Sequence, residues 1–412
     1  MPRVVAVRAA AGLGHGYSFG NDFYQVWLTS RQWLRQGRDP YSPQMTREIQ
    51  IGLYGRPLDP NRPSDPVDRR VFPYPAYADL LFWPTAEFPF APVRVVVVCI
   101  LAALTVAIVP LWLRAMAWSL NWGWIVMSVL LTVCSYPALE GLYSGQLGLL
   151  VAFLLAASLV ALKRHQFLLA GTLMALTTIK PQMTALAILY LLAWTTYDWS
   201  TRRRFWIGLF STLILLVGAS FIVLPNWIQS WMHTVLAYRH YTRPPLVTEV
   251  LTSPLGPRWA GPATLVLTAA SVVIAMWLAW HNRAAAFGSF AFWITFTLVL
   301  SITTITILPG QAIYDHLILV PAVLLLARHR SELRDAGPVP RSLLSIGVLV
   351  LLWPWIAALV LILLRPWVAP RIFDSTAVFS LPIRTAASLP FAVLASLAWL
   401  KRVSVIRNSE AA

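Results

Sequence analysis

Long apolar runs separated by short polar loops fill the chain from residue 93 onward. An α-helix needs about 20 apolar residues to cross a hydrocarbon core of about 30 Å. The runs predict eleven membrane-spanning segments, at about Val93–Ala117, Trp122–Leu139, Gly148–Leu162, Phe167–Ile179, Thr184–Trp194, Phe205–Leu224, Ala263–Trp280, Ala286–Leu308, Ala312–Ala327, Leu343–Leu364 and Ala377–Leu400. The roughly 10-residue alternating segments of a membrane β-barrel are absent from the sequence. We therefore expect an all-α polytopic membrane protein.

Two of these segments are short and are separated by Lys180-Pro181. Proline removes a backbone donor, and its ring clashes with the preceding helical turn. The dipeptide therefore predicts two half-helices or a broken pair of helices.

The composition agrees with a membrane protein, since 58% of the residues are hydrophobic and only 12% are charged. Soluble domains carry about one quarter charged residues. The formal net charge of +16 comes mostly from arginines in short loops. That distribution is typical of membrane topology rather than of nucleic-acid binding, so we expect no nucleic-acid partner.

The basic residues divide unequally when alternate loops are assigned to opposite sides of the membrane. One side collects Arg114, Lys163, Arg164, Arg202, Arg203, Arg204, Arg283, Arg328, Arg330, Arg334, Arg341, Lys401, Arg402 and Arg407. After the first span, the loops of the other side hold only Lys180, Arg239, Arg243, Arg258, Arg365 and Arg371. Loops rich in lysine and arginine stay in the cytoplasm, so we predict a multi-pass protein of the plasma membrane with the first set inside.

Three regions follow from this topology. Residues 1–92 form an extracytoplasmic first loop with interfacial helices, residues 93–400 form the transmembrane bundle, and residues 401–412 form a cytoplasmic tail. An outer first loop requires a span before it. We expect either a further span ahead of Met1 or a short helix at Val4–Gly16, and we favour the further span.

Acidic residues are more frequent on the predicted outer side. Only Asp198, Glu332, Asp335 and Glu410 face the cytoplasm. The outer side or its border holds Asp22, Asp39, Asp59, Asp65, Asp68, Asp79, Glu87, Glu140, Glu249, Asp315 and Asp374. The outer side therefore offers more carboxylates that could take part in acid–base chemistry. We interpret the proline-rich run Arg56–Arg70 as a flexible loop and discount it as a source of catalytic residues.

The stretch Gly20–Pro43 predicts an amphipathic helix at the membrane interface, because tryptophans and arginines favour the headgroup level. Arg31, Arg35 and Arg38 are suited to contact lipid phosphate. Asp22 stands near the start of this helix. It is either a helix N-cap, a position that aspartate favours, or a reactive carboxylate.

Two further stretches carry polar and aromatic residues on the outer side. Val71–Pro84 alternates prolines with aromatic residues and predicts an interfacial anchor ahead of the first long span. Tyr136–Leu150 places Tyr143 and Gln146 between two spans, next to glycines that permit close backbone approach.

Ionisable residues also enter the apolar runs. Lys180 lies between apolar segments. Charges at membrane depth are costly and therefore indicate a function, although Lys180 can instead extend its ammonium to the interface. Asp315 and His316 open another apolar run. They can bind a phosphate, position a hydroxyl group or form a polar contact between helices.

Taken in order, NDFYQVW, GRDPYSP, FPYPAY, SGQLGLL, AGTLMALTTIKPQ and YDHLILVPAVLLL resemble the integral-membrane glycosyltransferases of family 87, which have the GT-C fold. That family includes the mycobacterial polyprenyl-phosphomannose-dependent mannosyltransferases. The similarity extends over about residues 20–326. It implies a GT-C-like bundle that moves a mannose-like hexose from a polyprenyl-phosphate donor to a lipid or glycan acceptor, at the extracytoplasmic face of a lipid membrane.

The resemblance also implies roles for individual residues. In that family an aspartate just after the first transmembrane helix is the catalytic base, and Asp22 matches it. The residues expected to contact the donor phosphate or the acceptor are Lys180, His316, Asp315, Gln146 and Tyr143. The implied reaction inverts the anomeric centre while the aspartate removes the proton of the acceptor hydroxyl. We expect no cofactor and no obligatory metal ion.

Two other functions share part of this pattern. A polymerase or ligase of lipid-linked glycans would share the external site and the polyprenyl substrate. A transporter or flippase would share the broken helices and the buried charges. Alternating access does not need a large acidic and aromatic first loop, so the glycosyltransferase is the favoured hypothesis.

Overall fold

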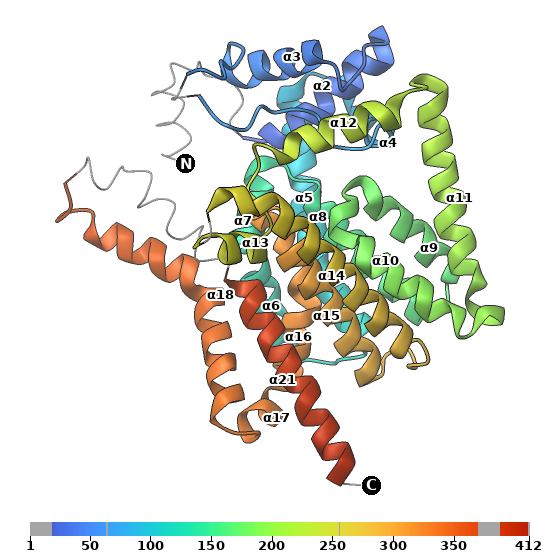
Figure 1. Cartoon of the computed structure of the whole chain (residues 1–412), viewed down its shortest axis with the longest axis vertical. Helices are drawn as coiled ribbons and strands as arrows, with labels where there is room; N and C mark the ends of the chain where they lie inside the picture. Colours follow the sequence, from blue (N-terminus) through green and yellow to red (C-terminus); the bar gives the residue numbers. More distant parts are fainter. Residues whose placement is uncertain (1–18, 63–64, 255, 370–387, 411–412) are drawn as a thin grey trace.

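The computed structural model describes residues 19–62, 65–254, 256–369 and 388–410, and all regular elements in these ranges are helices (Figure 1). With η marking 3₁₀-helices, they are α2 (Asn21–Gln36), α3 (Pro43–Tyr54), α4 (Tyr77–Phe82), η1 (Trp83–Glu87), α5 (Phe90–Ala115), α6 (Trp122–Val133), α7 (Tyr136–Ser144), α8 (Gly148–Lys163), α9 (Phe167–Leu176), η2 (Thr177–Ile179), α10 (Pro181–Thr196), α11 (Trp199–Val223), α12 (Trp227–Arg239), α13 (Leu246–Thr252), η3 (Pro257–Trp259), α14 (Ala260–His281), α15 (Phe290–Thr306), η4 (Ile313–Leu319), α16 (Val320–Arg328), α17 (Arg330–Asp335), α18 (Pro338–Leu364) and α21 (Leu389–Glu410). The expected all-α fold is confirmed for the described residues.

The number of membrane spans differs from the expected eleven. Five helices of the described chain, α5, α11, α14, α18 and α21, are long and apolar enough to cross a membrane. The pair α6 and α7, bent by 55°, gives a sixth candidate. Helix α8 has 16 residues and spans about 24 Å, less than the hydrocarbon core. Helices α9 and α15 are also apolar but short, so the structure does not confirm a count of eleven.

The described helices form a bundle with a cap at one end. Figure 1 shows α2, α3, α4 and α12 gathered at that end, above the bundle that contains α5, α8, α10, α14 and α15. Helices α9 and α11 approach backbone to backbone within the bundle. A Cβ on Gly171 would lie 2.1 Å from the carbonyl oxygen of Phe205, and one on Gly208 would lie 2.1 Å from that of Leu168. Small residues permit such close contact between membrane helices.

The first loop is folded around α2. The Trp27 indole donates to the carbonyls of Thr85 and Phe88 at 3.1 and 3.0 Å, which fixes α2 against η1 and the start of α5. Two of the arginines expected at lipid phosphate form ion pairs inside this loop. Arg35 pairs with Glu87, and Arg38 pairs with Glu48 at 2.6 Å.

The stretch expected to be an interfacial anchor, Val71–Pro84, is largely buried instead. Phe72 and Tyr77 are at most 5% exposed, and the Tyr77 hydroxyl donates to the carbonyl of Thr178 at 2.8 Å. The rings of Phe72, Tyr74 and Tyr77 are buried inside the protein, whereas Trp83 near the end of the stretch is 52% exposed. The stretch therefore joins the cap to the bundle beside Lys180.

The run Arg56–Arg70, expected to be a flexible loop, is organised by an ion pair. The Arg56 guanidinium contacts both carboxylate oxygens of Asp65, at 2.8 and 2.5 Å. This hydrogen-bonded pair lowers the pKa of the Asp65 carboxyl to about 2. Arg70, at the end of the run, is held next to the cap by its own hydrogen bonds to Tyr54 of α3 and Asp22 of α2.

The break at Lys180-Pro181 is confirmed. Helix α9 tightens into η2, which ends at Ile179, and α10 begins at Pro181. Lys180 itself is non-helical, with φ −129° and ψ 75°. Proline at the first position of a helix loses no hydrogen bond, because that N–H has no partner inside the helix.

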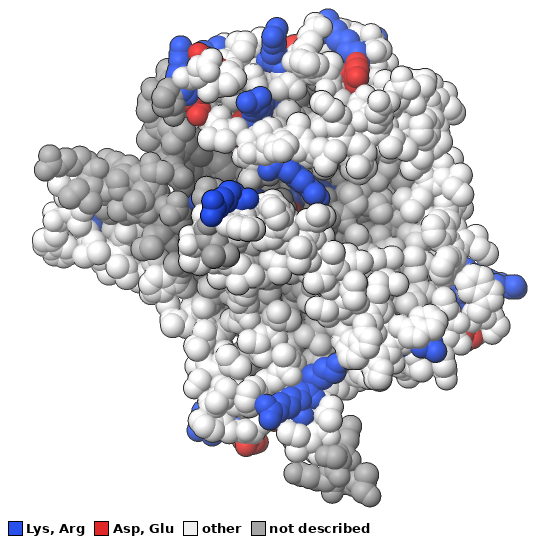
Figure 2. Space-filling model, viewed as in Figure 1, with Lys and Arg blue, Asp and Glu red and all other residues white. Residues whose placement is uncertain are grey.

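Loops expected on the basic side meet at the end of the bundle away from the cap. Lys163 Nζ donates to the carbonyl of Arg114, and Arg328 donates to that of Met116 at 3.0 Å. Figure 2 shows that most charged side chains of the visible face lie toward its two ends. These contacts place Arg114, Lys163 and Arg328 together at one end of the bundle, while the alternation of all the loops and their assignment to the cytoplasm stay predictions. Val4–Gly16, Asp374 and the first part of Ala377–Leu400 lie outside the described residues.

Candidate active site

Asp22 lies in the first turn of α2 but does not cap the helix. The N-cap residue is Gly20, at φ 72° and ψ 20°, and no side chain caps this end. The N-cap interpretation of Asp22 is therefore wrong. A carboxylate in the first turn is still favoured by the helix dipole. The two carboxylate oxygens of Asp22 accept hydrogen bonds from Arg70 and Gln146 instead.

Two glycines bring Asp22 next to Gln146. Gly20 begins α2 and Gly145 ends α7, both with positive φ, which glycine adopts without strain. The Gly20 N–H donates to the carbonyl of Tyr143 at 2.8 Å. A Cβ on Gly145 would lie 3.3 Å from Gly20 Cα. The start of α2 and the end of α7 are therefore in direct backbone contact.

Asp22 accepts hydrogen bonds on both carboxylate oxygens. Arg70 Nη1 donates to Oδ1 at 2.7 Å, and the Gln146 amide nitrogen donates to Oδ2. Arg70 Nε in turn donates to the Tyr54 hydroxyl at 2.8 Å. Arg70 has φ 56°, a conformation that non-glycine residues rarely adopt. The guanidinium is therefore fixed between the end of α3 and the start of α2.

Gln146 links Asp22 to Lys180. Its amide oxygen accepts a hydrogen bond from Lys180 Nζ at 3.3 Å, while its amide nitrogen donates one to Asp22. A carboxylate on one side and an ammonium on the other leave only one favourable orientation of the amide. Gln146 is 4% exposed, so water does not compete strongly for these bonds.

Lys180 and Asp315 form a buried ion pair. Lys180 Nζ lies 2.7 and 3.0 Å from the two oxygens of Asp315, and the two residues are 5% and 1% exposed. Lys180 Nζ also lies 4.8 Å from the centre of the Tyr314 ring. The Asp315 carboxylate sits directly on Gly148, whose Cβ would be only 2.2 Å from Oδ1. The expected polar contact between helices is therefore made by Asp315.

Tyrosines of the cap surround this network. Burial, followed by the negative charges of Asp22 and Asp315, raises the pKa of Tyr74 well above its ordinary value. Burial, together with Asp68 and Asp22, also raises the pKa of Tyr238. Both phenols therefore stay protonated and keep a hydrogen-bond donor near Asp22 at any physiological pH.

The other predicted site residues are nearby but join the network differently. Tyr143 contributes its carbonyl to Gly20, and its ring meets Phe19 edge-on at 5.9 Å. His316 is buried, and its Nδ1 has no hydrogen-bond partner among the described residues. Glu140, on α7, carries a buried Oε2 that likewise has no partner in the described chain. These two atoms retain hydrogen-bonding capacity for a ligand.

Arg70 is the site residue that sequence analysis missed. It ends the charged run that was discounted as a flexible loop, and no local pattern distinguishes it from Arg56, Arg62 or Arg69. Its contact with Asp22 joins positions 48 residues apart. Only the folded cap reveals the pair.

The described residues contain no cluster of three or more histidine, cysteine, aspartate or glutamate side chains placed to hold a metal ion. The donors and acceptors of the site are instead Arg70 with the carboxylates of Asp22 and, at 3.7 Å, Asp68, the Lys180–Asp315 pair, and the Gln146 amide between Asp22 and Lys180. This set can accept a proton and can neutralise an anionic group.

The model of glycosyltransferase family 87 matches residues 72–306 of the chain, more than half of its length. The chain belongs to glycosyltransferase family 87. It is therefore a membrane glycosyltransferase, and the family resemblance noted in the sequence is confirmed. A search of curated proteins found no match.

The region matched to family 87 includes Gln146 and Lys180 but ends before Asp315 and His316. It also starts two positions after Arg70, so Asp22 lies ahead of it. The structure brings residues from inside and outside this region into one network, through the contacts of Gln146 with Asp22 and of Lys180 with Asp315.

Proposed function

We propose that this family 87 protein transfers a mannose-like hexose from a polyprenyl-phosphate donor to a lipid or glycan acceptor, with inversion at the anomeric carbon. The observation that carries the proposal is the position of Asp22. Its carboxylate is 16% exposed and hydrogen-bonded to Arg70 and Gln146, at the end of the bundle that the cap covers. An accessible carboxylate beside fixed cations suits a hydroxyl acceptor and an anionic donor.

Asp22 acts as the general base in this proposal. An acceptor hydroxyl binds to one Asp22 oxygen, and its proton moves to the carboxylate as its oxygen attacks the anomeric carbon. The bond between that carbon and the phosphate oxygen breaks, and polyprenyl phosphate leaves with the electron pair. Each carboxylate oxygen has two lone pairs, so the bonds from Arg70 and Gln146 leave room for the hydroxyl.

Arg70 is the best-placed cation for the leaving phosphate. Its bonds to Tyr54 and Asp22 use two of the five N–H donors of a guanidinium. Guanidinium groups match phosphate oxygens geometrically and stay charged. Lys180 is less suited to direct contact, because its three N–H donors already face two Asp315 oxygens and the Gln146 amide.

Lys180 and Asp315 then serve the reaction by orienting Gln146. His316 and Glu140 each keep a buried polar atom without a partner among the described residues. We assign these atoms to hydroxyl groups of the acceptor or of the transferred sugar, because a buried polar group is costly unless it is hydrogen-bonded.

The orientation of the site in the membrane follows from charge. The loops that meet at the end away from the cap carry Lys163, Arg202 and Arg328. Positively charged loops favour the cytoplasm. The cap and Asp22 therefore face the extracytoplasmic side, where a polyprenyl-phosphate sugar is the donor in place of a soluble nucleotide sugar.

The test is hexosyl transfer by membranes that contain the Asp22→Asn variant, supplied with polyprenyl-phosphomannose and a lipid acceptor extract. Loss of the base should lower the rate about 10²- to 10⁴-fold. Asp59→Asn is the matched control, since Asp59 is exposed in the first loop and its role as acceptor for Asn61 is retained by asparagine. An Asp22→Asn variant with undiminished transfer would remove Asp22 from the mechanism.

A further inference from the structure

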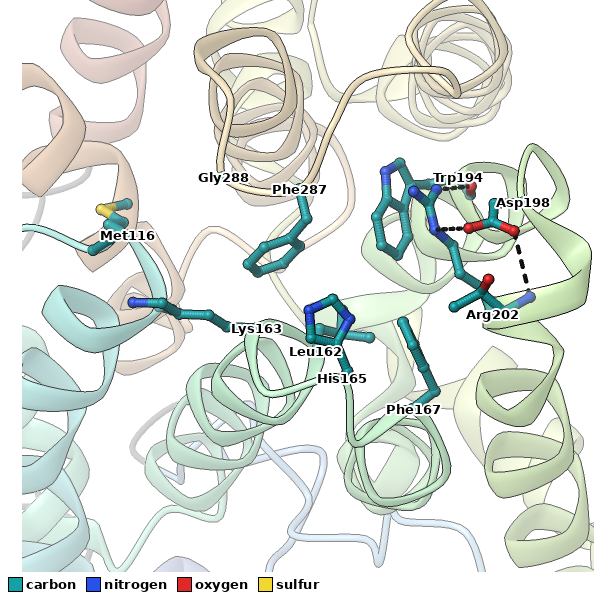
Figure 3. Close-up of a pocket in the computed structure, with 13 residues that line it drawn as sticks. Met116, Leu162, Lys163, His165, Phe167, Trp194, Asp198, Arg202, Phe287 and Gly288 are labelled. Atoms are coloured by element: carbon teal, nitrogen blue, oxygen red, sulfur yellow. Dashed lines mark hydrogen bonds and ion pairs between the residues drawn. The ribbon is translucent and has the colours of Figure 1, made fainter.

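A cavity of about 450 Å³ opens at the end of the bundle away from the candidate active site (Figure 3). Four chain reversals form its walls: the end of α5, the turn between α8 and α9, the turn between α10 and α11, and the turn between α14 and α15. Three of the helices involved, α5, α11 and α14, are candidate membrane spans that begin or end at this cavity. The cavity therefore lies at the level of lipid headgroups.

This cavity is separate from the Asp22 network. Helix α8 begins two residues after Gln146 and ends at Lys163 in the cavity wall. Helix α10 begins directly after Lys180 and ends two residues before Asp198 in the same wall. Each helix has 16 residues, a length of about 24 Å. A ligand of the cavity would not touch the reacting groups.

The walls combine aromatic rings with an excess of positive charge. Figure 3 shows Phe287, Phe167 and Trp194 around the cavity, with Lys163 on one side and Arg202 on the other. The charged groups of the lining are Lys163, Arg202 and one carboxylate, Asp198. Two cations against one anion leave a net positive wall.

The two cations differ in how they are held. The Arg202 guanidinium stacks over the Trp194 ring at 3.7 Å, donates to its carbonyl at 3.0 Å and lies 3.8 Å from Asp198. Lys163 Nζ donates to the carbonyl of Arg114 and forms no ion pair with a carboxylate of the described residues. Lys163 therefore brings an uncompensated charge to the rim of the cavity.

The backbone of the walls is strained. Three non-glycine residues of the described chain have positive φ: Arg70, Ala117 and His165. Arg70 contacts Asp22, and the other two line this cavity, at φ 50° and 56°. Such conformations are rare outside glycine and gather at sites that bind ligands. The non-glycine residues with positive φ in the described chain therefore lie either at the candidate active site or in the wall of this cavity.

We propose that this cavity binds the phosphate headgroup of an anionic membrane lipid. Basic pockets between membrane helices recognise such headgroups, because an ammonium and a guanidinium both favour phosphate oxygens. The aromatic walls suit the glycerol and upper acyl carbons of the same lipid. The ligand is anionic rather than zwitterionic because the wall offers net positive charge.

The experiment uses the full chain, purified in a neutral detergent and freed of lipid. Its thermal midpoint is measured while phosphatidylglycerol, phosphatidylcholine or inorganic phosphate is added. A ligand that binds only the folded state raises this midpoint. We expect saturable stabilisation by phosphatidylglycerol alone. Equal stabilisation by phosphatidylcholine, or by inorganic phosphate at the same concentration, would overturn the proposal.

Variants then locate the binding site. Lys163→Gln should weaken the apparent affinity for phosphatidylglycerol about five-fold, since one basic residue near the membrane surface contributes about that factor. Lys163→Arg keeps the charge and should restore the affinity. Thr201→Trp, in the cavity wall, should block the lipid without changing any charge. Arg330→Gln is the control, because Arg330 is exposed and does not line the cavity.

These variants also distinguish binding from folding. Each variant must first unfold cooperatively in the absence of lipid, which shows that it is folded. Hexosyl transfer by the same variant is measured separately and shows whether the Asp22 network is intact. Unchanged phosphatidylglycerol affinity in folded Lys163→Gln and Thr201→Trp proteins would refute the site. Loss of affinity in Arg330→Gln equal to that in Lys163→Gln would also refute it, by showing attraction to the basic end as a whole.

Discussion

Asp22 and Gln146 are 124 positions apart in the chain, yet the Gln146 amide donates a hydrogen bond to an oxygen of the Asp22 carboxylate. The same amide accepts from Lys180, whose ammonium is held by Asp315. A buried ion pair in the bundle thus orients the amide that orients the proposed base. The first loop and the bundle are joined at the proposed base itself.

This relationship makes Gln146 a positioning residue. We predict that Gln146→Ala lowers kcat for hexosyl transfer about 10- to 100-fold, because a hydrogen bond to a charged group contributes about 1.5–3 kcal/mol. The measurement is initial rate against donor concentration in membrane vesicles. Gln44→Ala is the control, since Gln44 is exposed on α3. A change confined to KM would instead assign Gln146 to substrate binding.

Arg70 should resist replacement even by lysine. Lysine presents all its donors from a single nitrogen, so it cannot reproduce the geometry in which two separate guanidinium nitrogens, Nε and Nη1, contact the Tyr54 hydroxyl and Asp22 at 2.8 and 2.7 Å. We predict that Arg70→Lys raises KM for the polyprenyl-phosphate donor and lowers kcat/KM at least about 10-fold, the factor for about 1.4 kcal/mol.

The control for this variant is Arg47→Lys, on the exposed side of α3. Both variants are compared at equal amounts of folded protein. If Arg70→Lys keeps full kcat/KM at low donor concentration, Arg70 is not a ligand of the leaving phosphate.

Hydropathy could predict the long helices because lipid selects for uninterrupted apolar residues. The expected span Val93–Ala117 corresponds to α5 and Phe205–Leu224 to most of α11. The sequence also predicts the break at Lys180, because the proline that follows it disrupts a helix within one turn of its own position. Hydropathy could not separate the long candidate spans from shorter apolar helices such as α8 and α15, because the two kinds of helix are similarly apolar.

The site could be predicted only in part, because some of its contacts depend on how distant parts of the chain fold together. Asp22 and Lys180 were identified by family resemblance and by the cost of a charge in an apolar run. The role of Arg70 depends on the fold of the cap, which pairs it with Asp22 across 48 positions. No propensity or spacing encodes that contact. The burial of Tyr77 was missed likewise, because an aromatic residue suits lipid headgroups and a protein interior equally well.

Asp79 should make the stability of the cap depend on pH. Its carboxyl is buried under α2, where the hydroxyls of Thr29 and Ser30 donate to Oδ1 at 2.9 and 3.1 Å. Burial raises the pKa of Asp79 well above its ordinary value. The folded state therefore holds a proton that the unfolded state releases near pH 3.9. This contribution to stability is complete below that pH and is lost as pH rises through the raised pKa.

We predict that Asp79→Asn flattens the decline of the thermal midpoint with rising pH, since asparagine keeps the acceptor and cannot ionise. Asp79→Leu should lower the free energy of unfolding by about 1–3 kcal/mol, because the Thr29 and Ser30 hydroxyls lose their contact with the Asp79 carboxyl and keep only backbone carbonyls as partners. The measurement is thermal unfolding in detergent from pH 5 to pH 9. An unaltered slope in Asp79→Asn would show that another group titrates.

Gly148 tests the link between helix packing and catalysis. A methyl group there would lie 2.2 Å from Asp315 Oδ1 and 3.4 Å from Lys180 Nζ. The ion pair must shift, and Gln146 with it. We predict that Gly148→Ala costs about 1–3 kcal/mol of stability through overpacking and also lowers kcat. Gly218→Ala is the matched control, because a Cβ at that position in α11 meets nothing within 4 Å. Equal hexosyl-transfer rates in the two folded variants would show that the Lys180–Asp315 pair does not position the reacting groups.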